Sequence, residues 1–318
     1  MPIPPMLPIL HTHVPAMVWL EDGDDNFVRW SESTQAIGTV LRWPEAQLLD
    51  DRRAGDTPSI TGRGSGAVMV WRGGDPDRRL WWSRLSGSSS TAGGPVWSPQ
   101  QPVRSAPPGG FPPELIVTAS PPAVGRFGDR VFLAWMDPRD NPPQHLCLAE
   151  LQGDQWGPTI RLAGAITQNA VAFGEHSGLL HMTLRGYGPH DTYIDWYTFN
   201  GESWHYRGKQ NQFAASSGPA LASDGATLHM AWRRAGDDHL GWSTFNGETW
   251  SPEIVLTDRR SAAAPALAQT DSGKVAMVWA GATGDNRLWW SVFDGNHWSE
   301  QQPFPDRWSN RGHPAALA

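Results

Sequence analysis

The stretch that decides the fold is Val275-Ala276-Met277-Val278-Trp279, followed by Leu288-Trp289-Trp290-Ser291 and then by Phe293-Asp294-Gly295-Asn296-His297-Trp298. The same order of motifs occupies residues 228–250, about 48 residues earlier in the chain. Short apolar runs that alternate with turn residues at a fixed period of this length are typical of propellers and solenoids.

Three tryptophan landmarks recur along the chain and define six units. The first falls at Trp19, Trp71, Trp135, Trp232 and Trp279, with Leu184 in the fourth unit. The second falls at Trp30, Trp82, Trp196, Trp242 and Trp290, with Leu148 in the third unit. The third falls at Trp43, Trp97, Trp156, Trp204, Trp250 and Trp298. Because they repeat at fixed positions, we expect these tryptophans to pack between neighbouring units.

Each unit holds four short runs, of which the first resembles Pro-Ala-Leu-Ala, as at residues 265–268. Residues two apart, such as Met277 and Trp279, share a face, which indicates strands. The sequence therefore predicts an all-β, six-bladed propeller with four antiparallel strands per blade. The predicted blades, within one domain of residues 1–318, are approximately 11–50 with 312–318, 56–103, 120–162, 168–209, 217–256 and 263–304.

The two ends of the chain predict how the ring closes. The first blade begins at its second strand, near residues 14–20, and no Pro-Ala-Leu-Ala run precedes it. That run appears instead at the C-terminus, as His313-Pro314-Ala315-Ala316-Leu317-Ala318. We therefore expect the C-terminus to supply the innermost strand of blade 1, which leaves no open sheet edge.

Composition excludes several classes of protein. The 318 residues carry a formal net charge of −7 and no basic run, which argues against a nucleic-acid partner. The single cysteine, Cys147, excludes an intrachain disulfide, and we expect it to be buried in a strand. No apolar run is long enough to span a membrane, and the N-terminal residues do not resemble a signal peptide, so we expect a cytoplasmic protein. No metal-binding or cofactor-binding motif is present, so we expect neither group.

The Asp/Asn-Gly-x-x-Trp end of each blade, as at residues 294–298, resembles the repeat of the six-bladed fucose-binding lectins and of related tectonin-type propellers. This resemblance implies a propeller that binds carbohydrate at several sites between its blades. The fucose site of that family uses an Arg on the second strand, a Glu on the third strand and a stacking Trp. Alignment on Asp294-Gly295 places Trp290 at the Glu position, and Trp242 in blade 5, so this Glu is not retained.

Several residues outside the repeat are candidate ligand contacts. Arg72, Arg185 and Arg233 directly follow the first landmark in blades 2, 4 and 5, where blades 1, 3 and 6 have Leu20, Met136 and Ala280. An arginine offers a fork of donors to a carboxylate or to paired hydroxyls, although a salt bridge to the Asp of the following turn is the alternative. Trp81 and Trp289 precede the second landmark, and each would either stack on a flat ligand or pack on the next blade.

A second group of candidates is expected near the axis. His181 and His229 occupy equivalent strand positions in blades 4 and 5, and they are the catalytic candidates if the protein is an enzyme. The alternative is a structural role for both. The residues just before the innermost strands are expected to ring the mouth of the central funnel, and they are Thr57, Pro121, Gln168, Gly218, Ala264 and His313. Among these, Gln168 and His313 are candidate ligand contacts.

Blade 2 carries two insertions, at residues 86–95 and 103–119. The second is rich in Pro and Gly and contains Phe111, so it is either a lid over the funnel or a surface insertion.

Three functions remain open at this point. The first is a lectin-like protein that binds a small molecule or glycan. The second is an enzyme that uses one site in the central funnel to act on a small apolar or aromatic metabolite, as a lyase, hydrolase or cyclisation catalyst. The third is a platform for protein interactions.

Overall fold

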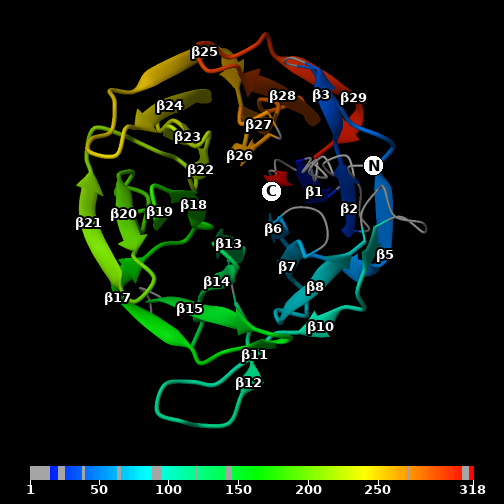
Figure 1. Cartoon of the computed structure of the whole chain (residues 1–318), viewed down its shortest axis with the longest axis vertical. Coiled ribbons are helices and arrows are strands. Elements are labelled where there is room, and N and C mark those ends of the chain that lie inside the picture. Colours follow the sequence, from blue (N-terminus) through cyan, green and yellow to red (C-terminus); the bar gives the residue numbers. More distant parts are fainter. Residues whose placement is uncertain are drawn as a thin grey trace, which may run out of the picture.

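Six sheets are arranged radially around one axis in the computed structural model, which confirms the predicted propeller (Figure 1). The structure describes residues 15–20, 26–37, 40–62, 66–87, 95–118, 120–139, 145–270, 272–309 and 315–318. Within these ranges every regular element is a strand. No helix in the described part of the chain is long and apolar enough to cross a membrane.

The first three blades have the following strands, from the axis outward. Blade 1 contains β30 (Ala316–Leu317), β1 (Ala16–Leu20), β2 (Phe27–Glu32) and β5 (Gln47–Arg53). Blade 2 contains β6 (Ser59–Thr61), β7 (Val68–Arg72) and β8 (Leu80–Ser86), with β9 (Val96–Trp97) and β10 (Gln101–Pro102) both paired to β8. Blade 3 contains β13 (Ala123–Phe127), β14 (Arg130–Met136) and β15 (His145–Gln152), with β16 (Gln155–Trp156) and β17 (Ile160–Ile166) both paired to β15.

The remaining blades each have four strands in sequence order. Blade 4 contains β18 (Ala172–His176), β19 (Leu179–Arg185), β20 (Ile194–Phe199) and β21 (Trp204–Gln210). Blade 5 contains β22 (Ala220–Ser223), β23 (Leu228–Arg233), β24 (His239–Phe245) and β25 (Ile254–Arg260). Blade 6 contains β26 (Ala266–Gln269), β27 (Val275–Ala280), β28 (Arg287–Phe293) and β29 (Gln302–Trp308). Two small hairpins lie outside the blades, β3 (Thr34–Ile37) with β4 (Val40–Arg42) and β11 (Arg104–Ser105) with β12 (Glu114–Leu115).

The ring closes as the sequence predicts. The C-terminal strand β30 pairs antiparallel with β1, with Met17 opposite Leu317 and Val18 opposite Ala316. Ala16 and Ala318 add two reciprocal backbone hydrogen bonds of 3.0 Å. Because the two ends of the chain share one sheet, blade 1 has an innermost strand like those of the other five blades, and the inner edge of β1 is paired.

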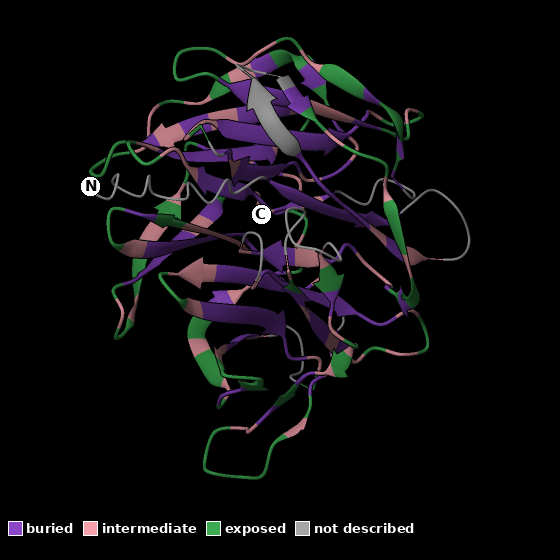
Figure 2. Cartoon of the chain, turned by 45° about the vertical axis from the view of Figure 1, so that its right-hand side comes forward, coloured by how far each residue is buried: buried purple, intermediate pink, exposed green. Residues whose placement is uncertain are grey.

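The tryptophan landmarks pack the blades against one another. The first-landmark tryptophans are at most 2% exposed. The second-landmark ring of one blade meets the third-landmark ring of the next edge to face, as for Trp242 and Trp298, whose centroids lie 5.9 Å apart at 83°. Figure 2 shows the outcome, with buried residues filling the inner strands and exposed residues concentrated on the outermost strands and the loops. The expected packing role of these residues is thus confirmed.

The Asp/Asn-Gly-x-x-Trp motif forms the turn that leads into the outermost strand. In blade 6 the Asp294 carboxylate accepts the backbone N–H groups of Asn296 and His297, both at 2.8 Å. Gly295 has a φ of 110°, a left-handed conformation that side chains disfavour. The turn therefore needs a short acceptor followed by glycine, which explains why this pair recurs.

Three buried arginines on outermost strands each connect their own blade to the next one in the ring. Arg259 of β25 donates from Nη2 to the Ser299 carbonyl at 2.6 Å and to Ser291 Oγ at 3.1 Å, and its guanidinium lies 6.0 Å from the centroid of Trp279. Arg52 makes the same kind of contacts with blade 2, and Arg307 with blade 1. These arginines were not predicted from the sequence, although the Asp-Arg pair recurs before the end of three outermost strands, at residues 51–52, 258–259 and 306–307.

The insertion of residues 103–119 lies at the outside of the ring. Its β11–β12 hairpin projects away from the axis, and Phe111 is 63% exposed (Figure 1). Of the two alternatives for this segment, the structure therefore supports the surface insertion and not the lid over the funnel, because the hairpin is attached to the outer part of blade 3. Ser105 Oγ donates to the Gly157 carbonyl there at 2.7 Å. In the other insertion, residues 88–94 fall outside the described part of the chain.

Candidate functional site

A cavity of about 940 Å³ lies on the axis of the propeller, and the innermost strand of every blade contributes to its wall. Neighbouring innermost strands contact one another around the whole ring, including β30 between β26 and β6. Because every blade repeats the same antiparallel strand order from the axis outward, all six point the same way along the axis. Their first residues therefore form one mouth of the cavity and their last residues form the other.

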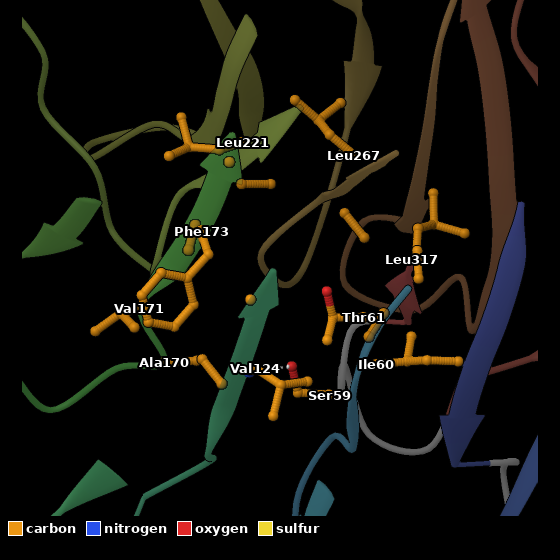
Figure 3. Close-up of a pocket in the computed structure, with 18 of the residues that line it drawn as sticks. Ser59, Ile60, Thr61, Val124, Ala170, Val171, Phe173, Leu221, Leu267 and Leu317 are labelled. Atoms are coloured by element: carbon orange, nitrogen blue, oxygen red, sulfur yellow. Dashed lines mark hydrogen bonds between the residues drawn. The ribbon is translucent and has the colours of Figure 1, made fainter. Parts of the chain in front are cut away.

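The wall of the cavity is mainly apolar. Figure 3 shows Leu221, Leu267, Leu317, Val124 and Phe173 around the cavity. The alanines of the Pro-Ala-Leu-Ala runs suit this position, because six strands meet most closely at the axis and only small side chains fit between them.

Blades 3 and 4 depart from this run, and glycine makes the departure possible. A Cβ at Gly125 would lie 2.3 Å from the Cβ of Phe173 in the next blade, and a Cβ at Gly174 would lie 2.9 Å from the Cβ of Leu221. Both glycines therefore leave room for a larger side chain from the neighbouring blade. The aromatic ring of Phe173 fits into the wall because Gly125 has no side chain in the space that the ring needs.

The first mouth has uncharged polar groups. The predicted ring of residues is confirmed for Thr57, Pro121, Gln168, Gly218 and Ala264, which all line the cavity. His313, the sixth, lies outside the described residues. Gln168 is exposed on this rim, and its role as a ligand contact stays a prediction.

The second mouth is charged, because Arg126, Asp129 and Glu175 line it. Arg126 donates from Nη2 to the Gly66 carbonyl at 3.0 Å, and Glu175 Oε2 accepts the Gly128 N–H at 2.9 Å. Burial lowers the pKa of Arg126, and the nearby Asp129 opposes this shift. The cavity is thus an apolar passage with one neutral and one charged rim.

His181 and His229 lie between blades and are not part of the cavity wall. Trp196 Nε1 donates to His181 Nδ1 at 3.1 Å, and Trp242 Nε1 donates to His229 Nδ1 at 3.2 Å. Burial lowers the pKa of His181 to about 4, and it lowers the pKa of His229 against the opposing effect of Asp224. The expectation that both reach a ligand on the axis is wrong, because each ring is turned to the indole N–H that a buried second-landmark tryptophan must satisfy.

One histidine near the axis was missed by the sequence analysis. His176 Nδ1 lies 3.0 Å from Ser223 Oγ, and Ser223 lines the cavity. Ser223 Oγ also accepts the Gly225 N–H at 3.0 Å, which holds the hydroxyl in a turn. Among the described residues, the other ring nitrogen of His176 is buried and has no hydrogen-bond partner, so no acid orients the ring. The pair has the contact of a serine nucleophile and its base but lacks the third group.

The three candidate arginines are held in the links between strands. Arg185 donates from Nε to the Ala215 carbonyl at 2.9 Å, and Arg233 donates from Nε to the Ser261 carbonyl at 2.7 Å. Arg72 pairs with Asp56 and Asp75 rather than with Asp77, the turn residue expected as its partner. None of the three lines the axial cavity. These arginines therefore do not reach the axial cavity, because their guanidinium groups bond to backbone carbonyls and local carboxylates. Their contact with a ligand elsewhere on the propeller stays a prediction.

Trp81 and Trp289 occupy matching, half-buried positions on β8 and β28. Trp81 Nε1 donates to Asp77 at 2.8 Å, and Trp289 Nε1 donates to Asp285 at 3.0 Å. In each blade an arginine guanidinium lies 4.9 Å from the ring centroid. The indole N–H and one ring face are thus already in contact with neighbouring residues. Stacking of a flat ligand on these rings stays a prediction.

Comparison with known proteins identifies the fold and no closer relationship. No protein-family model matches the chain, and no curated protein matches its sequence. A mutant of Aleuria aurantia lectin in complex with Fucα1-6GlcNAc matches with a TM-score of 0.65 at 13% identity, over 96% of this chain and 97% of that one. The SapL1 lectin in complex with α-methyl fucoside matches with a TM-score of 0.58 at 12% identity, over 93% and 99%. A Hadza microbial sialidase matches with a TM-score of 0.55 at 16% identity, over 89% and 67%. The resemblance to the propeller lectins is thus confirmed for the fold.

Proposed function

We propose that this protein binds a small, largely apolar molecule in its axial cavity. The observation that carries the proposal is the cavity itself, whose volume of about 940 Å³ falls in the range of small-molecule sites and whose wall is apolar. A ligand would gain roughly 25 cal/mol for each Å² of apolar surface removed from water, on its own body and on half-exposed wall residues such as Phe173.

The two rims suggest how such a ligand is oriented. Thr57 and Gln168 offer uncharged donors and acceptors at one mouth, whereas Arg126, Asp129 and Glu175 offer charges at the other. A ligand with an apolar body and one polar end suits this arrangement, because a few placed polar groups fix orientation in an otherwise apolar site. We propose binding alone, because the Ser223–His176 contact, which is the nearest to a catalytic pair in the described wall of the cavity, lacks an orienting acid.

A titration with the neutral fluorescent probe N-phenyl-1-naphthylamine tests the proposal. We expect saturable binding at a single site and at least tenfold weaker binding in the Leu221→Trp variant, because the larger ring occupies the cavity. Ile254→Trp is the matched control, since Ile254 lies on the outer strand of the same blade and is 48% exposed. Equal affinity in Leu221→Trp and Ile254→Trp, or binding that does not saturate, would contradict the proposal.

Carbohydrate binding at the outer part of the propeller is the second candidate function. It is supported by the fold shared with proteins solved in complex with fucosides and by Trp308, which is 40% exposed opposite Arg287. An exposed indole ring suits stacking on a sugar. A glycan array distinguishes the two candidates. Binding that a free monosaccharide competes away, and that persists in Leu221→Trp, would favour the carbohydrate site.

A further inference from the structure

One position of the repeat holds a guanidinium group in three blades and, among the described residues, borders an open pocket in a fourth. In blades 2, 4 and 5 the residue after the first landmark is Arg72, Arg185 or Arg233, and each side chain fills the gap between the turn to the third strand and a link to a neighbouring blade. Blade 6 has Ala280 there. Blades 1 and 3 have Leu20 and Met136, which are both 1% exposed and fill the space with apolar atoms.

The gap beside Ala280 is a pocket of about 340 Å³. It is lined by Ala262, Ala280, Gly281, Ala282, Thr283, Gly284, Asp285, Asn286 and Ser309. Its residues come from the three segments that surround the guanidinium in the other blades, namely the incoming link, the turn between the second and third strands, and the outgoing link. The pocket therefore occupies the volume that the missing arginine would take.

Blade 4 shows which atoms hold the guanidinium when it is present. Arg185 donates to the carbonyls of Ala215, in the outgoing link, and of Gly186, in the turn, at 2.9 and 3.2 Å. Burial lowers the pKa of Arg185, and the charge of Asp191, also in the turn, opposes this shift. Position by position, the corresponding residues of blade 6 are Ser309, Gly281 and Asp285, and all three line the pocket.

The two turns also have the same close contact between glycine and aspartate. A Cβ on Gly186 would lie 2.2 Å from the Asp191 carboxyl carbon, and a Cβ on Gly281 would lie 2.6 Å from the Asp285 carboxyl carbon. In both blades, therefore, only glycine lets the carboxylate approach the backbone so closely. The backbone carbonyls of the guanidinium site are thus retained in blade 6, although its arginine is not, and neither are the counterparts of Asp56 and Asp75 that hold Arg72 in blade 2.

We propose that the pocket beside Ala280 binds the guanidinium group of a small cationic ligand. The acceptors in equivalent positions are the backbone carbonyls of Ser309 and Gly281, and the Asp285 carboxylate beside them is already paired with Arg287 at 2.8 Å. A planar cation with five N–H donors matches several fixed acceptors better than an ammonium does, because its donors lie in one plane in a fork. The site is separate from the axial cavity, so the inference does not depend on the function proposed above.

Saturation-transfer NMR with methylguanidinium chloride as the probe tests this assignment. We expect saturable binding to the wild-type protein and at least tenfold weaker binding to Ala280→Arg, whose own side chain fills the pocket as in blades 2, 4 and 5. Ala226→Arg is the matched control, because it adds the same charge at an exposed turn outside the pocket and should leave binding unchanged. Tetramethylammonium, a cation without N–H donors, should not compete.

Two further measurements keep the outcome clear. Ala280→Arg should raise the thermal midpoint above that of the wild type, whereas a lowered midpoint would mean that the pocket does not fit a guanidinium group. If Ala280→Arg does not fold, Ala280→Leu blocks the pocket as Leu20 does in blade 1. Methylguanidinium binding that survives both blocking variants, or that is absent from the wild type, overturns the proposal. Loss of binding in Leu221→Trp instead would place the cation in the axial cavity.

Discussion

Replacing Arg259 with alanine should weaken the contact between blades 5 and 6 and destabilise the whole ring. The variant loses two hydrogen bonds from a charged donor to blade 6, to the Ser299 carbonyl at 2.6 Å and to Ser291 Oγ at 3.1 Å, together with the packing on Trp279. It also loses the ion pair with Asp258 of its own strand, at 2.7 Å. Each such bond contributes about 1.5–3 kcal/mol net. The guanidinium also regains its hydration in the unfolded chain, which offsets part of the loss. We expect the free energy of unfolding to fall by about 2–4 kcal/mol.

Urea unfolding followed by tryptophan fluorescence measures this change. The midpoint should fall while the slope stays constant, because the surface exposed on unfolding is nearly the same. Arg260→Ala is the control. The Arg260 side chain, next to Arg259 in the chain, is 59% exposed, so its removal should change the free energy of unfolding by no more than about 0.5 kcal/mol. Arg259→Lys should not restore stability, because an ammonium cannot stack on the ring and reach both acceptors. If Arg259→Ala and Arg260→Ala unfold at the same urea concentration, the connecting role of Arg259 is refuted.

Two further predictions concern pH and backbone conformation. Burial lowers the pKa of His181 to about 4 in the folded state, so between about pH 6.5 and 4 the unfolded chain binds more protons and stability falls as the pH falls. In chemical denaturation, the free energy of unfolding of wild type should therefore fall relative to that of His181→Phe as the pH is lowered through this window. A difference between the two proteins that stays constant from about pH 7 to 4 would contradict this prediction. Gly295→Ala should cost about 1–2 kcal/mol because its φ is 110°, although no atom lies within 4 Å of the added Cβ. Gly74→Ala is the control, because Gly74 has no positive φ and an added Cβ would lie 3.9 Å from its nearest neighbour. Thermal unfolding of both variants should show that Gly74→Ala is neutral or stabilising.

The fold could be predicted because its determinants repeat within the sequence. Each blade needs a buried ring on its second strand and a tight turn into its outermost strand, so tryptophan and the Asx-Gly pair recur at equivalent positions. Closure was also predictable, because the missing first run of blade 1 was present at residues 313–318. Where the repeat is interrupted, as in the insertion with Phe111, the sequence left two alternatives open and the structure selected the surface hairpin.

The candidate sites were less predictable, because contacts across blades have no period along the chain. Arg72 was expected to pair with the recurring turn Asp, but Asp56 and Asp75 lie nearer to its guanidinium. His229 was expected near the axis, yet its ring accepts the indole N–H of Trp242, a residue of the same blade. The sequence also did not reveal that Gly125 makes room for Phe173, since the two residues belong to different blades.

The sequence by itself determined the number of blades, their strand order and the closure of the ring, because these depend on local alternation, on turn chemistry and on a repeat that can be counted. Only the tertiary structure decided which residues face the axis, which arginines connect blades and where a pocket remains. Those outcomes depend on distances between side chains that lie far apart along the chain. The pocket beside Ala280 illustrates the difference. The alanine in place of arginine is visible in the sequence, but only the structure shows that the three surrounding segments leave the space open.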